Sequence, residues 1–253
     1  MLTAAQRAHF DTFGFLVFRQ RFTTKEIASI SREADRIWAE ERGGRPFSGD
    51  DEQAIAPFVE RSNRLTDLVT DDRVYLALQD LLGPGFVWAG SEGNITVRGY
   101  HPWHADRPCT EKELTYVRLK MSMYLDPVTP DSGCLRVIPG SHKMPLHTEI
   151  EPEEHHQRGP KVAPFDVNGA DLPYHPLESN PGDVIFFNQS MWHGVFSAFS
   201  GRRFMVMKFA PQPTEDWHLD ELTRYKKDVL SPDERWLAND HPRIRGMVTH
   251  RSN

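Results

Sequence analysis

Cysteine is scarce in this chain of 253 residues, which contains only Cys109 and Cys134. Two cysteines in a chain of this length do not form a disulfide framework, and such usage is typical of a reducing compartment. The N-terminus lacks a basic start followed by an apolar segment, and no apolar run approaches the ~18 residues of a membrane span. We therefore expect a cytoplasmic protein that is not membrane-bound.

An excess of positive charge is missing as well. Lysine and arginine number 30 against 36 aspartates and glutamates, which gives a net charge of -6. The broad basic field of a protein that binds nucleic acid or an anionic membrane is therefore absent. Small molecules are the expected partners, and no pattern in the sequence predicts an oligomeric state.

Helical signals dominate the first part of the chain, from residue 1 to about 85. Thr3 is placed to cap a short helix that ends at Gly14, and the β-prone run FLVF follows. Thr23 and Glu26 have the spacing of a capping box before a long amphipathic segment. The segment GGRPFSGDDEQ is typical of a flexible loop, and TDDRVYLALQDLLG (70–83) predicts a further amphipathic helix.

From about 86 to 212 the sequence changes to short β-prone segments that turns separate. Many short strands without intervening helices predict an antiparallel sandwich or a jelly roll, that is, a mainly β core with flanking α-helices. A long segment from Lys143 to Asn180 lacks a clear period and is expected to be a loop that shapes the entrance to a site. From 213 to 253 helical signals resume, with Ser231 as a cap and Pro232 in the first turn. One domain over 1–253 is expected.

The segment GYHPWHADRP carries the first candidate site. His104 and Asp106 are two positions apart, so in an extended strand both side chains point the same way. A mononuclear Fe(II) oxygenase needs two imidazoles and one carboxylate on one face of the metal. His193, at the end of GDVIFFNQSMWHG, is the best candidate for the second imidazole. Taken singly, a solvated His-Asp pair and an ordinary core histidine are the more common situations.

Two adjacent arginines follow in SGRRFMVMKFA. A guanidinium at the head of this strand could hold the far carboxylate of a metal-bound keto acid, for which bidentate arginine is suited. Strand alternation groups Arg203 with Met205, Met207 and Phe209, and Arg202 with Phe204, Val206 and Lys208. This periodicity does not choose between them. Chance alone rarely gives His-x-Asp, His and Arg in this order.

The chain resembles the phytanoyl-CoA dioxygenase family over most of its length. FDTFGFLVF with FTTKEIASISREADRIW, WHAD, LDPVTPDSGCLRVIPGSHK and GDVIFFNQSMWHG are each similar to a segment of that family. The resemblance implies a double-stranded β-helix (jelly roll, cupin-like) core that uses Fe(II), 2-oxoglutarate and O2. It also implies that His104, Asp106 and His193 bind iron and that Arg202 pairs with the distal carboxylate of 2-oxoglutarate. Ala105 and the short separation of His193 from Arg202 depart from the family pattern.

The resemblance further implies hydroxylation, or another oxidation, of a small-molecule metabolite, as in natural product biosynthesis. Asp106 disfavours halogenation, for which related enzymes carry a small residue. Alternatives are a cupin-type isomerase or lyase, a non-catalytic ligand-binding relative, and a protein or nucleic-acid demethylase.

Further residues near the motif are weaker candidates. Asn94 and Thr96 share a strand face and could bond the cosubstrate, although polar residues that serve only the sheet are somewhat more common. Trp103, Arg107 and Arg98 could meet the substrate, or could serve packing and surface. His142 is expected to be structural, and His101 to face away from His104; neither is assigned to the site.

Overall fold

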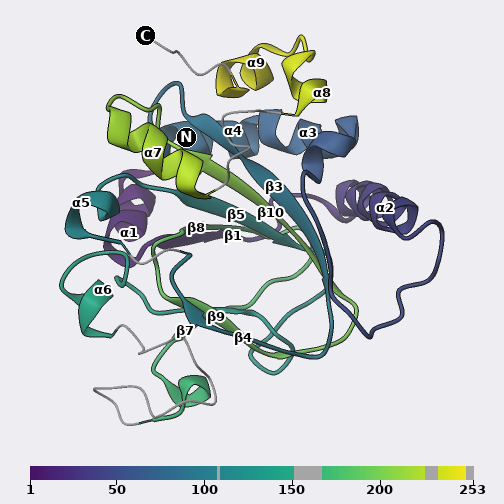
Figure 1. Ribbon diagram of the computed structural model, residues 1–253, viewed down its shortest axis with the longest axis horizontal. Coiled ribbons are helices and arrows are strands. Elements are labelled where there is room, and N and C mark those ends of the chain that lie inside the picture. The colour runs from purple at the N-terminus through teal and green to yellow at the C-terminus, as the bar shows by residue number, and fades with distance from the viewer. Residues whose placement is uncertain (107–108, 151–166, 226–232, 249–253) are drawn as a thin grey trace.

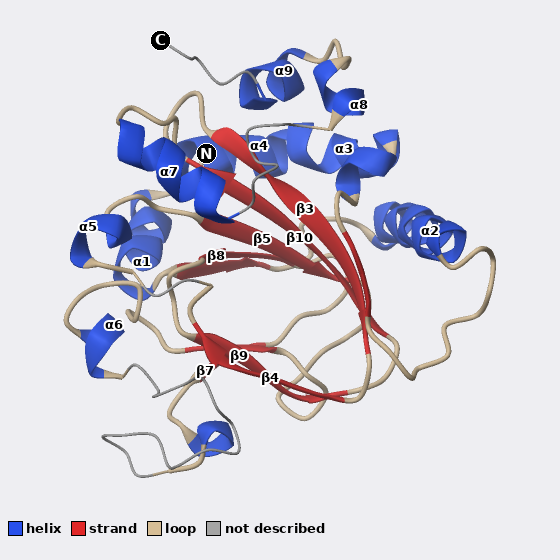
Figure 2. Cartoon of the chain, viewed as in Figure 1, coloured by secondary structure: helices blue, strands red, loops and turns tan. Residues whose placement is uncertain are grey.

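Two antiparallel sheets face each other, and helices cover the outer side of the larger sheet (Figures 1 and 2). The computed structural model describes residues 1–106, 109–150, 167–225 and 233–248. Its helices are α1 (Ala4–Phe13), α2 (Thr24–Glu41), α3 (Asn63–Thr70), α4 (Asp72–Leu82), α5 (Glu111–Leu114), α6 (Leu146–Glu149), α7 (Asp216–Tyr225), α8 (Glu234–Leu237) and α9 (Pro242–Val248), with 3-10 turns η1 (Val59–Arg61) and η3 (Gly169–Asp171). Its strands are β1 (Phe15–Phe18), β2 (Gln53–Ile55), β3 (Val87–Thr96), β4 (Gly99–His104), β5 (Leu119–Tyr124), β6 (Leu135–Val137), β7 (His175–Leu177), β8 (Val184–Asn188), β9 (His193–Ala198) and β10 (Arg202–Ala210).

The sheet order confirms the predicted jelly roll. The larger sheet has the order β1-β8-β5-β10-β3-β2, and the smaller sheet has the order β4-β9-β6-β7. Strands that are consecutive in the chain repeatedly belong to opposite sheets, as β3 and β4 or β9 and β10 do. This alternation between sheets encloses one interior space, which a double-stranded β-helix uses for its site.

Both faces of the larger sheet are buried, which explains its side-chain pattern. On β5, Leu119, Met121 and Met123 pack in the cluster that the helices share. The alternate residues of β5 belong to the space between the sheets, where Tyr124 packs with Leu135, Val137 and other apolar residues. Alternation therefore separates a helix-facing side from an interior side, and not a buried side from a solvent side.

The N-terminal elements begin and end where the sequence predicts. Thr3 and Thr23 each accept a hydrogen bond from the third helical backbone N–H, and the side chains of Gln6 and Glu26 complete both capping boxes. Gly14 ends α1 in the left-handed conformation, at φ 84°, which glycine adopts without a Cβ clash. The helix predicted over 70–83 is α4. The helix α3 and the strand β2 were not predicted.

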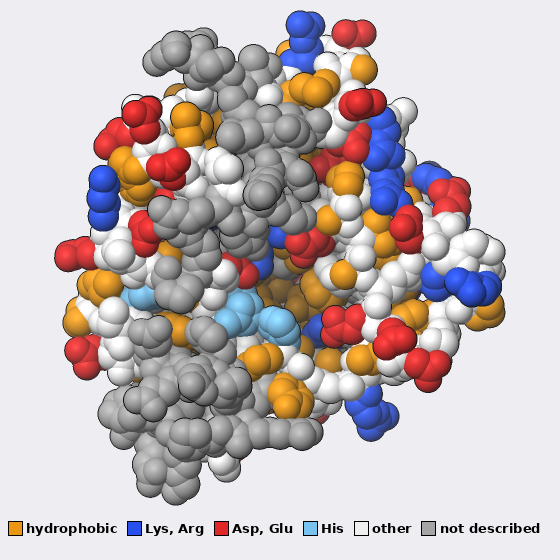
Figure 3. Space-filling model, viewed as in Figure 1, with side chains coloured by type: hydrophobic (Ala, Val, Ile, Leu, Met, Phe, Trp, Pro, Cys, Tyr) orange, Lys and Arg blue, Asp and Glu red, His pale blue; other side chains and the backbone are white. Residues whose placement is uncertain are grey.

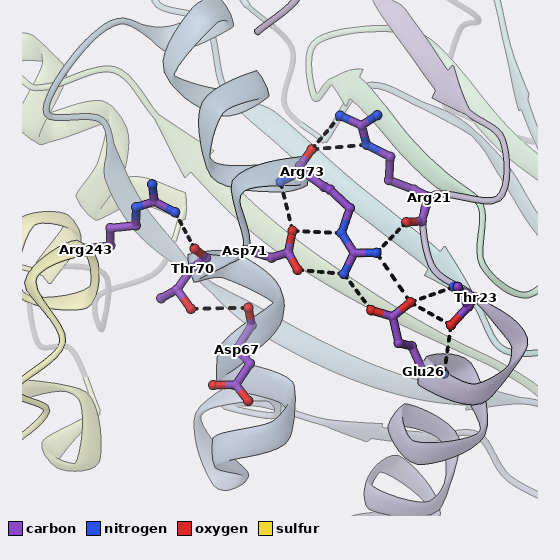
Figure 4. Close-up of polar contacts among 8 residues, drawn as sticks. All are labelled: Arg21, Thr23, Glu26, Asp67, Thr70, Asp71, Arg73 and Arg243. Atoms are coloured by element: carbon purple, nitrogen blue, oxygen red, sulfur yellow. Dashed lines mark hydrogen bonds and ion pairs between the residues drawn. The ribbon is translucent and has the colours of Figure 1, made fainter.

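Arg73 joins the starts of two helices (Figure 4). Its guanidinium contacts Glu26 at the start of α2 and Asp71, the cap of α4, at 2.7 Å each. It also donates to the backbone carbonyl of Arg21 at 2.9 Å. Hydrogen bonding to Arg73, before all other causes, lowers the pKa of Glu26 to about 2. The helical layer is thus held together by charge-assisted hydrogen bonds as well as by apolar packing.

The C-terminal helices α8 and α9 pack on the outer side of the larger sheet. Trp236 of α8 is buried with its ring centroid 4.3 Å from that of Trp88 on β3. Ile244 and Met247 of α9 are buried in the same cluster. The predicted cap Ser231 with Pro232 lies outside the described residues, and Asp233 is the residue that caps α8. Within the described ranges, no helix has the length and apolarity needed to cross a membrane.

The predicted loop from Lys143 to Asn180 carries short elements where the structure describes it. The helix α6, the turn η3 and the strand β7 lie in this segment. Residues 151–166 lie outside the described part.

We expect Gly93→Ala to destabilise the protein by about 1 to 3 kcal/mol, the cost of overpacking a core. A Cβ at Gly93 on β3 would overlap the ring of Phe58, which is fully buried. Urea unfolding measures the change in the free energy of unfolding. The matched control is Gly246→Ala in α9, where a Cβ meets nothing within 4 Å and helix propensity adds up to about 1 kcal/mol. Equal unfolding midpoints for the two variants would contradict the packing argument.

Candidate metal and cosubstrate site

His104, Asp106 and His193 converge at the end of the smaller sheet. The strands β4 and β9 pair so that His104 lies directly opposite His193, and the two ring centroids are 4.1 Å apart. Asp106 follows β4 and is held by its backbone N–H, which donates to the Gln189 carbonyl at 3.2 Å. Its Oδ1 lies 3.8 Å from Nε2 of His104 and 3.7 Å from Nε2 of His193. One ligand atom of each residue thus falls within 4.8 Å of the others.

Backbone carbonyls orient both imidazoles. Nδ1 of His104 lies 2.7 Å from the Pro102 carbonyl, and Nδ1 of His193 lies 2.8 Å from the Met191 carbonyl. Because a carbonyl only accepts, each Nδ1 carries the proton and each Nε2 keeps its lone pair toward Asp106. Oδ2 of Asp106 is buried and, among the described residues, accepts no hydrogen bond. Two nitrogen donors that converge on one carboxylate oxygen, Oδ1, fit a divalent transition metal.

The electrostatics of the site favour neutral imidazoles beside an ionised carboxylate. Burial lowers the pKa of His104 to about 2 and that of His193 to about 4. Burial alone would raise the pKa of Asp106, but the Lys120 ammonium, 2.6 Å from Oδ1, together with His193 and His104 outweighs burial, and this pKa falls to about 2. Ligands in these protonation states bind a metal without first losing a proton.

We expect acid to destabilise the metal-free protein through these two histidines. Above pH 6.5, the ordinary pKa of histidine, both imidazoles are neutral in the folded and in the unfolded protein. Protonation of these histidines then takes nothing from the free energy of unfolding. Below pH 6.5 the unfolded chain binds protons that the folded protein does not, and stability falls by up to about 1.4 kcal/mol per pH unit for each histidine. For His193 the loss is complete near pH 4. Urea unfolding between pH 7.5 and 4.5 measures it, and a double alanine variant with the same pH slope would contradict it.

The three residues lie in the wall of a cavity of about 370 Å³ between the sheets, here called the central cavity. Figure 3 shows histidine side chains beside a hollow in the middle of one face, with charged side chains around it. The larger sheet and its neighbours contribute Glu92, Asn94, Thr96, Lys120, Ser122, Tyr124, Phe187, Arg202, Phe204 and Val206. The smaller sheet contributes His101, His104, Leu135, His193, Val195 and Ala198.

The two arginines occupy different sides of β10. Arg202 lines the central cavity and is only 3% exposed; its Nε donates to Thr96 Oγ1 at 3.3 Å, and its Nη1 donates to the Gly133 carbonyl. Arg203 lies on the helix-facing side, where it pairs with Asp126 at 2.7 Å and with Asp35 at 2.9 Å. The apolar residues that alternate with Arg203 along β10, Met205, Met207 and Phe209, therefore face the helices.

The other sequence candidates have different positions. Asn94, Thr96 and the exposed Arg98 line the central cavity, whereas Arg107 lies outside the described residues. Trp103 is not among the residues that line it, and its expected contact with the substrate stays a prediction. Its ring is buried in a separate cluster that includes Trp192 and Phe196, and its Nε1 donates to the Gly169 carbonyl at 2.5 Å.

His101 and His142 also need comment. The expectation that His101 faces away from His104 is wrong, because β4 has register irregularities on both sides of His101. The two rings are 4.4 Å apart, and His101 lines the central cavity. His142 is elsewhere, with Nε2 3.0 Å from the carbonyl of Asp11 near the end of α1.

Sequence reasoning missed Lys120, Ser122 and Tyr124, which line the central cavity from β5. A signal was present in LKMSMY, where these residues alternate with Leu119, Met121 and Met123. An apolar set of alternate residues beside a polar set indicates that one side of the strand faces the apolar core and the other faces a polar interior.

Comparisons with known proteins agree with this architecture. A sequence model of the phytanoyl-CoA dioxygenase family matches residues 10–205. The ectoine dioxygenase of Sphingopyxis alaskensis is 29% identical over 224 residues, which cover 76% of this chain and 70% of that protein. Among solved structures, HygX from Streptomyces hygroscopicus with nickel and 2-oxoglutarate bound has a TM-score of 0.64 and 21% identity, covering 83% of this chain and 87% of HygX.

A second solved structure broadens the comparison. The non-heme alpha-ketoglutarate-dependent epimerase SnoN from nogalamycin biosynthesis has a TM-score of 0.62 and 19% identity, covering 85% of this chain and 87% of SnoN. At such identities the structures establish a common fold. The family match spans most of the chain, and it includes the segments that carry His104, Asp106 and His193. The chain therefore belongs to the phytanoyl-CoA dioxygenase family and is a 2-oxoglutarate-dependent dioxygenase that uses Fe(II) and O2.

Proposed function

We propose that His104, Asp106 and His193 hold Fe(II) in this enzyme and that Arg202 binds the distal carboxylate of 2-oxoglutarate. The observation that carries the proposal is the convergence of two Nε2 atoms on a buried carboxylate, in a cavity that also contains a buried guanidinium. Iron bound there supplies the activation of dioxygen that is coupled to oxidative decarboxylation of the keto acid. The substrate oxidised is a small metabolite, and hydroxylation is the proposed outcome.

Each residue has a role that its contacts support. The Pro102 and Met191 carbonyls keep the imidazoles in the tautomer that binds metal through Nε2. Arg202 is held by Thr96 and by the Gly133 carbonyl, and its carbon Cζ lies 5.6 Å from the centre of the Tyr124 ring. A guanidinium fixed in this way is preorganised for a carboxylate.

Secondary roles follow from position in the central cavity. Asn94 lies on the same side of β3 as Thr96 and is a further hydrogen-bonding group for the keto acid. Arg98 is exposed at the cavity and also lines a neighbouring hollow, where it could meet a polar or anionic part of the substrate.

Organisation and location complete the proposal. The helices of the first and last parts share one apolar cluster with the larger sheet, which supports a single domain over 1–253. The scarcity of cysteine supports a cytoplasmic enzyme with small-molecule partners, in natural product biosynthesis or a related pathway.

Two measurements test this function. Under argon, Fe(II) with 2-oxoglutarate should give a charge-transfer absorbance with the wild-type protein and not with His104→Ala. In air, a metabolite library is screened for substrate-stimulated release of succinate, with a mass increase of one oxygen in the product. Product formation without succinate or oxygen would instead indicate an isomerase or lyase, and absence of the absorbance would indicate a non-catalytic relative.

A further inference from the structure

Lys120 contacts the proposed metal site and has no role in the assignments above. Its Nζ lies 2.6 Å from Oδ1 of Asp106, and its side chain is 13% exposed. This Oδ1 is the same oxygen that lies within 3.8 Å of both Nε2 atoms. A lysine ammonium and a metal ion at the centre of the three ligand atoms would therefore share one carboxylate oxygen.

The position of Lys120 on a central strand keeps its ammonium close to Asp106. It lies on β5, which is paired on both sides, with β8 and with β10. Its Nζ is 5.9 Å from the centre of the Phe187 ring, which also lines the central cavity. Like charges repel more strongly away from bulk water. The ammonium consequently opposes a divalent cation that binds at Asp106 alone.

An anion placed in the central cavity would remove this opposition. Arg202 begins β10, whereas the residue of β10 in register with Lys120 is Lys208, near the other end of that strand. The cavity therefore has a largely buried cation toward each end, Arg202 away from the metal ligands and Lys120 beside them, and the exposed Arg98 lies at its surface. A dicarboxylate keto acid with one end on Arg202 brings its other carboxylate toward Lys120.

We propose that Lys120 is a positioning residue that makes metal binding depend on the keto acid. Without the keto acid, the ammonium partly neutralises Asp106 and weakens the binding of the metal. When the keto acid binds, its carboxylate neutralises the ammonium. The metal and the keto acid therefore each strengthen the binding of the other. This inference rests on the proposed function, since it assumes that Asp106 is a ligand and that the keto acid lies between Lys120 and Arg202.

The test measures metal affinity and does not need turnover. Mn(II) is titrated into the protein by calorimetry at one fixed pH, with and without 2-oxoglutarate, for wild type, Lys120→Met and Lys120→Gln. Without keto acid, both variants should bind Mn(II) about ten-fold more tightly than wild type, within the usual range of coupling between two ligands. The gain in affinity caused by 2-oxoglutarate should be about ten-fold smaller in the variants. Direct chelation by the keto acid is common to all of them, so the difference reports Lys120.

The control is Lys143→Met, which removes an ammonium paired with Asp11 at the surface, away from the central cavity; it should behave as wild type. Variants of Lys120 that bind Mn(II) as wild type does, or more weakly, overturn the inference. Failure of both variants to fold also overturns it, because the ammonium would then serve folding. If the wild-type protein binds no Mn(II), or if His104→Ala binds it equally well, the proposed function itself fails.

Discussion

His104→Ala and His193→Ala should each lose metal binding, and iron-dependent release of succinate should fall to background. Only three ligand candidates converge at the site within the described residues, so each substitution removes one of the three protein ligands of the metal. The expected loss of affinity exceeds the roughly 100-fold that loss of an outer partner of a metal ligand costs. Calorimetry with Mn(II) and a succinate assay measure the two effects.

The fold should survive these substitutions. Both imidazoles line the central cavity, so truncation enlarges an existing space and does not create an enclosed void in the apolar core. The matched control is His101→Ala, which removes an imidazole 4.4 Å from His104 in the same cavity and should leave Mn(II) binding intact. Equal losses in His101→Ala and His104→Ala would mean that the ligand set is wrongly assigned.

We expect Arg202→Ala to raise the 2-oxoglutarate concentration needed for half-maximal turnover by about 10- to 150-fold. This range corresponds to the roughly 1.5 to 3 kcal/mol of a hydrogen bond to a charged group. Arg202→Lys should recover part of the loss, because it restores the charge without the bidentate geometry. The measurement is a 2-oxoglutarate titration of succinate release at saturating iron.

Arg203→Ala is the control for this prediction, since it removes the neighbouring guanidinium. Its ion pairs with Asp126 and Asp35 are partly exposed, and such pairs contribute about 0 to 1 kcal/mol each. A lower unfolding temperature with an unchanged 2-oxoglutarate requirement is therefore expected. The reverse pattern, with Arg203→Ala impaired and Arg202→Ala normal, would reassign the clamp.

Local signals in the sequence were sufficient for much of the fold. Thr23 and Glu26 predicted the start of α2, and Gly14 predicted the end of α1, because caps depend on a few neighbouring residues. The succession of short β-prone segments predicted the jelly roll. The helix α3 was missed because Ser62 at its cap position is followed three residues later by Leu65, so the capping box that marks α1 and α2 is absent.

The site was harder to predict where tertiary structure decides orientation. The choice between Arg202 and Arg203 could not be made from alternation, since both faces of the larger sheet are buried. His101 was placed on the wrong side because a strand irregularity changes which residues share a face. Pro102 is compatible with a bulge in GYHPWH, but it does not fix where the alternation breaks. The role proposed for Lys120 depends on its contact with Asp106, and the sequence alone does not show that these two residues, 14 positions apart, meet.

The boundary of the family match has a practical consequence for shortened versions of this protein. The match ends at residue 205, inside β10, and β10 pairs with both β5 and β3. A chain trimmed to that boundary would lose residues 206–210 of β10, which would leave part of β5 and part of β3 unpaired in the larger sheet. It would also lose Trp236, which packs against Trp88. Exposed strand edges and apolar surface promote aggregation. Gene fragments for expression should therefore extend through α9, and affinity tags are better attached beyond it.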